Sequence, residues 1–234
     1  MVLPDIHGRP VNYAALIVGN GRGEYLEQVE RSIRDHVYVP IRYRVMVNDS
    51  RDDEYREWLE ERYPDWTLIH TRGAGMAGAV QAGWAACTEA DFVLHIEEDM
   101  LLTRRLPVAE AAAVLWSHPM SIAQMCWRRE PWWGSPEEVL YGDQLAAICA
   151  QATTVQQRAG YTLHDFLFSL NPCLVPKQII RVGWPSGPLG EGNESGMTAR
   201  CRDLGFLFGS WGSPDVHESW ARHIGEERGV GWSL

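Results

Sequence analysis

Residues 92–96, Phe-Val-Leu-His-Ile, form a short apolar run that leads directly into Glu97, Glu98 and Asp99. Such a run predicts a strand inside a sheet that is covered on both faces. Ionised carboxylates at the end of a buried strand lose hydration and need a counter-charge. In an open α/β sheet, ligands bind just beyond the carboxyl ends of the strands. The three acids therefore indicate a site for a hard divalent cation and for the diphosphate that it would bridge.

The sequence before these acids alternates apolar runs with helical patterns. The predicted strands are 13–18, 43–47, 66–70 and 92–96. The predicted helices begin near Glu24 and Asp53, and a third covers 73–87, with Pro40 ending the first. Strands that alternate with helices predict an α/β fold with a mostly parallel, doubly wound sheet.

The loop after the first strand, Gly19-Asn20-Gly21-Arg22-Gly23, can approach a ligand closely because three positions lack a side chain. A dinucleotide-binding dehydrogenase needs G-x-G-x-x-G, and here the third glycine comes one place early. A P-loop is excluded because no Gly-Lys-Ser/Thr follows. A nucleotide-sugar site needs an acid after the second strand and acids after the fourth. Asp49 and the 97–99 run supply both.

Net charge and cysteine content limit the partners and the cellular compartment that we expect for this protein. The 234 residues carry a net charge of −10, which disfavours broad attraction to nucleic acid or acidic membranes. The five cysteines are odd in number and scattered, which predicts reduced thiols in a cytoplasmic protein. No secretory signal opens the chain and no run of 18 apolar residues occurs, so we expect no stable membrane insertion.

Residues 13–100 resemble the nucleotide-binding half of GT-A fold glycosyltransferases, in particular the family 2 group. In that group an acid after the second strand reads the nucleobase, which is Asp49 here. The group then has a conserved motif at the start of the next helix, to which residues 75–83 correspond. Val80 and Gln81 stand where that motif usually has Arg and Asn. The group's D-x-D signature corresponds to residues 97–99, with Glu97 in its first place. The resemblance makes Asp99 the metal ligand.

The resemblance implies a single GT-A domain, in which residues 12–100 bind the nucleotide sugar and residues 101–234 bind the acceptor and carry the catalytic base. The implied donor is a nucleoside-diphosphate sugar, in the first instance a UDP-sugar, bound together with Mn²⁺ or Mg²⁺. The residues expected to contact the donor are Val18, Gly19, Asn20, Asp49, Gly75, Glu97 and Glu98.

The second half of the chain predicts helices over 108–116 and 137–151 and strands over 121–127 and 166–176. Trp132 and Trp133 lie in the predicted loop between the strand over 121–127 and the helix over 137–151. The two indoles could stack on an acceptor, or they could form a hydrophobic plug that holds the loop down.

A glycine-rich stretch, residues 187–196, leads into a helix expected from Met197 to Leu204. In inverting members of the family an Asp or Glu at this helix start acts as general base. We expect Glu194 in this role and Glu191 as the alternative, although either acid could simply cap the helix. Near the end of the chain, His223 is expected to be a second metal ligand by the same resemblance, or otherwise an ordinary surface residue.

The leading hypothesis is a metal-dependent inverting glycosyltransferase of the stand-alone bacterial or phage type. Its acceptor could be a polysaccharide, a lipid, a protein or a modified DNA base. A catalytically inactive sugar- or nucleotide-binding module on the same fold is one alternative. A sugar nucleotidyltransferase is another, but it would need a basic triphosphate loop, and Arg22 is the only cation in residues 19–23. The oligomeric state is left open.

Overall fold

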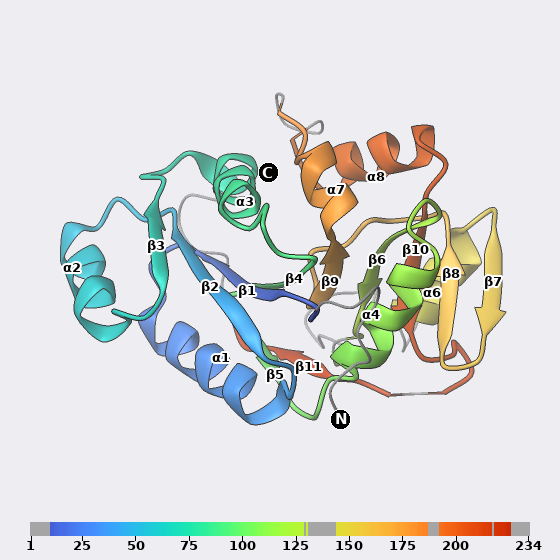
Figure 1. Cartoon of the computed structure of the whole chain (residues 1–234), viewed down its shortest axis with the longest axis horizontal. Coiled ribbons are helices and arrows are strands. Elements are labelled where there is room, and N and C mark those ends of the chain that lie inside the picture. Colours follow the sequence, from blue (N-terminus) through green and yellow to red (C-terminus); the bar gives the residue numbers. More distant parts are fainter. Residues whose placement is uncertain (1–9, 129, 131–143, 187–191, 217, 226–234) are drawn as a thin grey trace.

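The computed structural model describes residues 10–128, 130, 144–186, 192–216 and 218–225. Within these residues, a nine-stranded sheet runs through the molecule in the order β3-β2-β1-β4-β9-β6-β10-β8-β7 (Figure 1). A two-stranded ribbon, β5 with β11, lies apart from it. No helix in the described part of the chain is long and apolar enough to cross a bilayer.

The first half of the sheet is parallel, as the sequence predicted. Its strands are β1 (Tyr13–Gly19), β2 (Ile41–Asn48), β3 (Thr67–His70) and β4 (Phe92–Glu97). The helices that connect them are α1 (Gly23–His36), α2 (Asp53–Arg62) and α3 (Gly75–Ala86). Strand β1 lies between β2 and β4 and pairs in parallel with both, so its backbone is enclosed on both edges.

The second half of the sheet is mixed. Its strands are β6 (Ile122–Cys126), β7 (Val155–Arg158), β8 (Tyr161–His164), β9 (Cys173–Pro176) and β10 (Leu207–Trp211). Its helices are α4 (Val108–Ser117), α6 (Gln144–Gln151), α7 (Lys177–Val182) and α8 (Glu194–Asp203). Strand β9 is antiparallel to both of its neighbours, β4 and β6, and so joins the two halves.

Two predicted elements have different bounds in the structure. The strand expected over 166–176 is a strand only from Cys173 to Pro176. Helix α8 begins at Glu194 rather than Met197, because the side chain of Asn193 caps it by accepting hydrogen bonds from the backbone N–H groups of Ser195 and Gly196. For the helix predicted over 137–151, residues 137–143 lie outside the described residues.

Alternate residues of β1 face two separate cores. Ala15 and Ile17 pack with Leu26 of α1 on one face, whereas Leu16 and Val18 pack with α3 residues on the other. Helix α4 joins the first core, and residues of α7 and α8 join the second. Both faces of the sheet are therefore covered, which explains why all seven residues of β1 are buried.

The ribbon brings the late part of the chain to the end of β4. Strand β5 (Met100–Leu102) follows the acidic run directly and pairs antiparallel with β11 (Ala221–His223). In this register His223 is paired with Met100. The backbone N–H of Ile224 then donates to the carbonyl of Asp99 at 2.8 Å. Residues 223 and 224 are therefore tied to the acidic end of β4.

Two buried histidines lie within the core. His95 on β4 accepts a hydrogen bond from the indole N–H of Trp84 at 3.2 Å. His164 on β8 lies 3.3 Å from the hydroxyl of Ser210. Burial lowers the pKa of His95 to about 3 and, opposed only in part by Asp165, the pKa of His164 to about 4. Both rings are therefore neutral in the folded chain.

Acidification from pH 7.5 to pH 5 is expected to destabilise the fold. In the unfolded chain the two histidines take up protons below a pKa near 6.5, but the folded chain takes them up only near pH 3–4. The contribution of the two neutral rings to the free energy of unfolding is complete above pH 6.5. It is lost as the pH falls, by about 2 kcal/mol for each ring at pH 5. Urea unfolding at both pH values measures this loss. His164→Phe should roughly halve it, and a pH-independent free energy of unfolding would refute the assignment.

Candidate functional site

The carboxyl ends of β1, β2 and β4 meet at one edge of the sheet. Gly19 at the end of β1 is in register with Asn48 of β2, and Val18 is in register with Glu97 of β4. The loop after β1, the residues after β2 and the acidic run after β4 are therefore neighbours. Ligands of open α/β sheets bind at such an edge, which makes it the candidate site.

Glu98 connects two of these segments. Its carboxylate accepts hydrogen bonds from the backbone N–H of Asn20 at 2.9 Å and from the Nε of Arg22 at 2.7 Å. A third, longer contact comes from the backbone N–H of Arg22 at 3.3 Å. The side chain of Glu98 is 1% exposed, so these groups replace its lost hydration. Glu98 therefore holds the β1–α1 loop in place from inside the protein.

Gly19 is where that loop passes over Glu98. A Cβ added to Gly19 would lie 2.8 Å from the carboxyl carbon of Glu98, which is closer than real Cβ contacts allow. The position tolerates no side chain while Glu98 keeps its hydrogen bonds. The sequence predicted that glycine here permits close approach to a ligand. In the structure the atoms that Gly19 accommodates belong to Glu98.

Gly19→Ala is therefore expected to lower the free energy of unfolding by about 1–3 kcal/mol, the usual cost of forcing extra atoms into a packed site. The new methyl group must displace a carboxylate that three donors hold. Chemical unfolding of the variant beside the native chain measures the change. An unaltered unfolding midpoint would show that Glu98 moves away without cost.

Asp99 lies between the guanidinium of Arg22 and the imidazole of His223. Its Oδ2 is 2.9 Å from a terminal nitrogen of Arg22 and 3.2 Å from the Nε2 of His223. Burial opposes ionisation of Asp99, but the hydrogen bond from His223 and the charge of Arg22 outweigh burial and lower its pKa. Gly225 also packs here, because a Cβ on it would lie 2.7 Å from the same oxygen. The structure thus brings together the two residues expected to hold a metal.

Asp99 and His223 fit a site for a divalent cation that also takes ligands from a diphosphate. A carboxylate oxygen and an imidazole nitrogen converge, and both types of group bind Mn²⁺. Among the described residues, no group of three or more His, Cys, Asp or Glu side chains is arranged to hold a metal. Mg²⁺-type sites commonly use only one or two protein carboxylates, with phosphates and water supplying the remaining ligands.

Asp49 accepts four hydrogen bonds from one loop. Its Oδ1 accepts from the hydroxyl of Thr71 at 2.6 Å and from the backbone N–H groups of Gly73 and Ala74 at 3.0 and 2.7 Å. Its Oδ2 accepts from the backbone N–H of Gly75 at 2.9 Å. Asp49 is only 4% exposed, and its carboxylate anchors the β3–α3 loop at this edge of the sheet. Direct contact of Asp49 with a nucleobase stays a prediction.

Glu194 lies at the first turn of α8, where its carboxylate accepts a hydrogen bond from the backbone N–H of Leu170. Burial raises the pKa of Cys173 well above its usual range, and the nearby thiol of Cys126 and the charges of Glu194 and Glu97 add to the rise. Leu170 lies just before Cys173, where β9 begins next to His95 of β4. The carboxylate of Glu194 is therefore bound to the segment that leads into β9.

Three of the predicted site residues, Glu191, Trp132 and Trp133, lie outside the described residues. One residue of the site, Arg22, was not assigned a role by the sequence. A signal for it was present, because Arg22 is the only cation in residues 19–23 and the predicted acids need a counter-charge. What the sequence did not reveal is that Arg22 contacts both Glu98 and Asp99.

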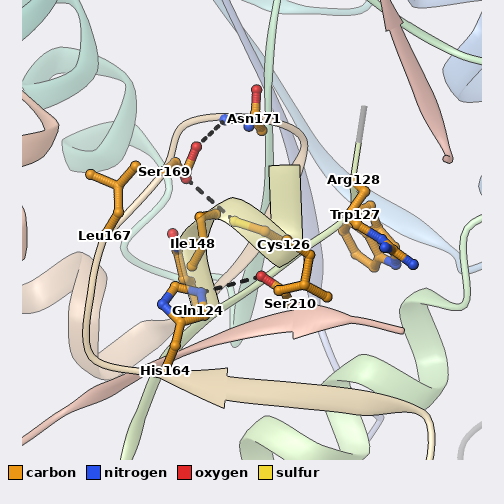
Figure 2. A pocket seen from close by; sticks show the side chains of 11 residues that line it. Gln124, Cys126, Trp127, Arg128, Ile148, His164, Leu167, Ser169, Asn171 and Ser210 are labelled. Carbon is orange, nitrogen blue, oxygen red and sulfur yellow. Dashed lines mark hydrogen bonds between the residues drawn. The ribbon is translucent and has the colours of Figure 1, made fainter. Parts of the chain in front are cut away.

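A narrow pocket lies between β6, β8, β10 and the segment before β9 (Figure 2). In the close-up the ring of His164 points toward Ser210, and Ser169 lies between Cys126 and Asn171. The carboxamide of Gln124 pairs with both backbone groups of Ser169. The space inside admits roughly one water molecule. A sugar ring does not fit a space of this width.

No family model matches the sequence, and no curated protein matches it. Solved structures do match. The mannosyltransferase PcManGT from Pyrobaculum calidifontis, in complex with GDP-Man and Mn²⁺, has a TM-score of 0.62 at 16% identity, with 97% of this chain and 61% of that chain covered. TarS 1–349 from S. aureus, in complex with UDP, has a TM-score of 0.61 at 12% identity, with 91% and 60% covered.

GalNAc-T7, in complex with UDP, GalNAc and Mn²⁺, has a TM-score of 0.58 at 12% identity, with 94% of this chain and 45% of that chain covered. The present chain therefore spans less than two thirds of each of these neighbours. Likeness at this level of identity establishes the fold. All three neighbours are glycosyltransferases of the GT-A type, and the chain described here has the GT-A fold.

Proposed function

We propose that this chain is a metal-dependent inverting glycosyltransferase that moves a sugar from a nucleoside-diphosphate sugar to an acceptor hydroxyl. The observation that carries the proposal is the contact between Asp99 and His223 at the sheet edge where the β1–α1 loop begins. The neighbours support it, because their structures contain GDP-Man or UDP, two of them with Mn²⁺. UDP as the nucleotide of this chain is part of the proposal.

In this proposal Asp99 and His223 hold the metal. When bound, the metal supplies positive charge that stabilises the departing diphosphate. Glu98 keeps the β1–α1 loop fixed beside the diphosphate, since its carboxylate binds that loop through Asn20 and Arg22. Asp49 keeps the β3–α3 loop fixed beside the nucleoside by its four hydrogen bonds. Both acids act by positioning loops before the donor arrives, which lowers the entropic cost of binding.

Glu194 is the proposed general base. The acceptor oxygen forms a bond to the anomeric carbon, the bond from that carbon to the diphosphate oxygen breaks, and the acceptor proton passes to Glu194. The hydrogen bond from the backbone N–H of Leu170 holds this carboxylate in place at the start of α8. Glu191 remains the alternative base.

Thermal unfolding with UDP and with GDP, each with and without Mn²⁺, tests the proposal. A nucleotide at 100 times its Kd adds about 2.7 kcal/mol to the stability of the folded chain. We expect UDP to raise Tm in the presence of Mn²⁺ and to have little effect with EDTA. A rise with GDP alone would replace UDP as the nucleotide but keep the class of enzyme. An unchanged Tm with both nucleotides, at millimolar concentration and with Mn²⁺, would speak against a nucleotide-sugar enzyme.

A further inference from the structure

Arg22 joins the two buried acids that follow β4. Its Nε donates to the Oε1 of Glu98 at 2.7 Å, and one of its terminal nitrogens lies 2.9 Å from the Oδ2 of Asp99. The side chains of Glu98 and Asp99 are 1% and 9% exposed, whereas that of Arg22 is 24% exposed. Two adjacent carboxylates with so little hydration need a counter-charge, and the guanidinium supplies it.

The guanidinium is held from several sides. The backbone N–H of Arg22 also contacts Glu98, and Arg22 is the N-cap residue directly before α1. Its guanidinium carbon lies 5.5 Å from the centre of the Tyr25 ring. A Cβ on Gly225 would lie 2.9 Å from its other terminal nitrogen. The contact with Asp99 is thus part of a packed arrangement and is not the chance position of a free side chain.

Arg22 and the proposed metal need the same oxygen. Oδ2 of Asp99 faces both Arg22 and His223, so a cation held by Asp99 and His223 would sit beside this oxygen. A guanidinium at 2.9 Å from Oδ2 would be in strong repulsion with that cation. The guanidinium must therefore leave Asp99 when a metal ion enters. A displaced guanidinium is well suited to a phosphate, which it can bind with two parallel hydrogen bonds.

We propose that Arg22 is an internal cation that occupies Asp99 until the metal and a diphosphate arrive together, and that it then transfers to the diphosphate. This inference rests on the proposed function, and it assigns Arg22 as a donor-binding residue. It makes binding of the metal conditional on the nucleotide. A metal ion alone must displace a guanidinium that then keeps only its contact with Glu98, whereas a metal ion with a diphosphate also supplies a new anion for it.

The test compares the native chain with Arg22→Gln in two titrations. In the first, Mn²⁺ is added without nucleotide and free Mn²⁺ is followed by electron paramagnetic resonance. Loss of the competing cation is expected to tighten Mn²⁺ binding by about tenfold or more. In the second, UDP and GDP are titrated at saturating Mn²⁺, and the nucleotide that binds the native chain is expected to bind the variant about tenfold more weakly. The two effects have opposite signs.

If Arg22 had only a structural role, its loss would weaken the binding of both Mn²⁺ and the nucleotide, because damage to the β1–α1 loop would disturb both sites. Equal or weaker Mn²⁺ binding by Arg22→Gln therefore overturns the proposal. Arg62→Gln is the matched control: Arg62 is paired with Glu27 on the surface, and its loss should change neither titration. Arg22→Lys guards against misfolding of the glutamine variant. The single ammonium of lysine cannot span both acids. The Mn²⁺ affinity of Arg22→Lys should therefore lie between that of the native chain and that of Arg22→Gln.

Failure of the proposed function would look different. If neither UDP nor GDP binds the native chain, the nucleotide-sugar assignment fails. The titration with Mn²⁺ alone still decides whether Arg22 competes for Asp99. A gain in Mn²⁺ affinity on loss of Arg22 supports the competition, and no gain overturns it.

Discussion

Replacing Glu194 with glutamine is expected to lower kcat by about 10²–10⁴-fold, the usual contribution of a general base. Donor and metal affinity should stay unchanged, because the substitution alters only proton transfer. The glutamine keeps an oxygen that can accept from the N–H of Leu170, and Asn193 rather than Glu194 caps α8. The melting temperature should therefore hardly move. Steady-state kinetics with nucleotide release as the readout measure the effect.

Glu191→Gln is the parallel variant, and it is expected to be mild. If Glu191→Gln loses turnover and Glu194→Gln does not, the base is Glu191. If both variants stay active, the start of α8 has a structural role and the inverting mechanism loses its base. Loss of donor affinity in Glu194→Gln would also count against a role limited to proton transfer.

Asp99→Asn is expected to abolish metal-dependent nucleotide binding and transfer. Losing an outer-shell partner of a metal already costs roughly 10–100-fold in affinity, and losing a ligand costs more. In the structure Asp99 is buried against Arg22 and His223, so asparagine, which keeps its shape, is the better probe than alanine.

Calorimetric titration of the nucleotide with Mn²⁺ measures this effect, with Asp35→Asn as the control because Asp35 is exposed on α1. The control should bind as the native chain does. Mn²⁺-dependent binding that survives in Asp99→Asn would remove Asp99 from the metal site.

Much of the fold could be predicted because its signals are local. The runs at 13–18 and 92–96 are apolar because both of their faces are covered, and in the second strand the buried part is Val45–Asn48. The second half was less predictable, since the hairpin of β7 and β8 has mostly polar residues on β7 and lacks an apolar pattern.

The site was predictable in its position but not in its contacts. The acids at 97–99 lie at the sheet edge as expected, but the sequence does not say which one faces inward. Glu98 points to the β1–α1 loop, and Asp99 points to Arg22 and His223. The contact with His223 depends on the pairing of β5 with β11, two short strands far apart in the chain. Pairings of that kind leave no local pattern in a sequence.

Asp49 is a second residue whose contacts could not be predicted from the sequence. A resemblance can align an acid with a position that reads a nucleobase, but it does not show how many donors already surround that acid. In this chain four donors from residues 71–75 bind the carboxylate of Asp49. Such a network depends on the turn after β3, which includes Gly73 and Gly75 at positive φ.

Turnover of sugar nucleotides by the native chain tests the proposed glycosyltransferase activity itself. UDP-sugars and GDP-sugars are incubated with the protein in Mn²⁺ or in EDTA, and released nucleoside diphosphate and the anomeric configuration of the sugar are followed by NMR. We predict release from at least one donor, only with Mn²⁺, and a product whose anomeric configuration is opposite to that of the donor. Release in EDTA, a product with retained configuration, or no release from any donor would contradict it.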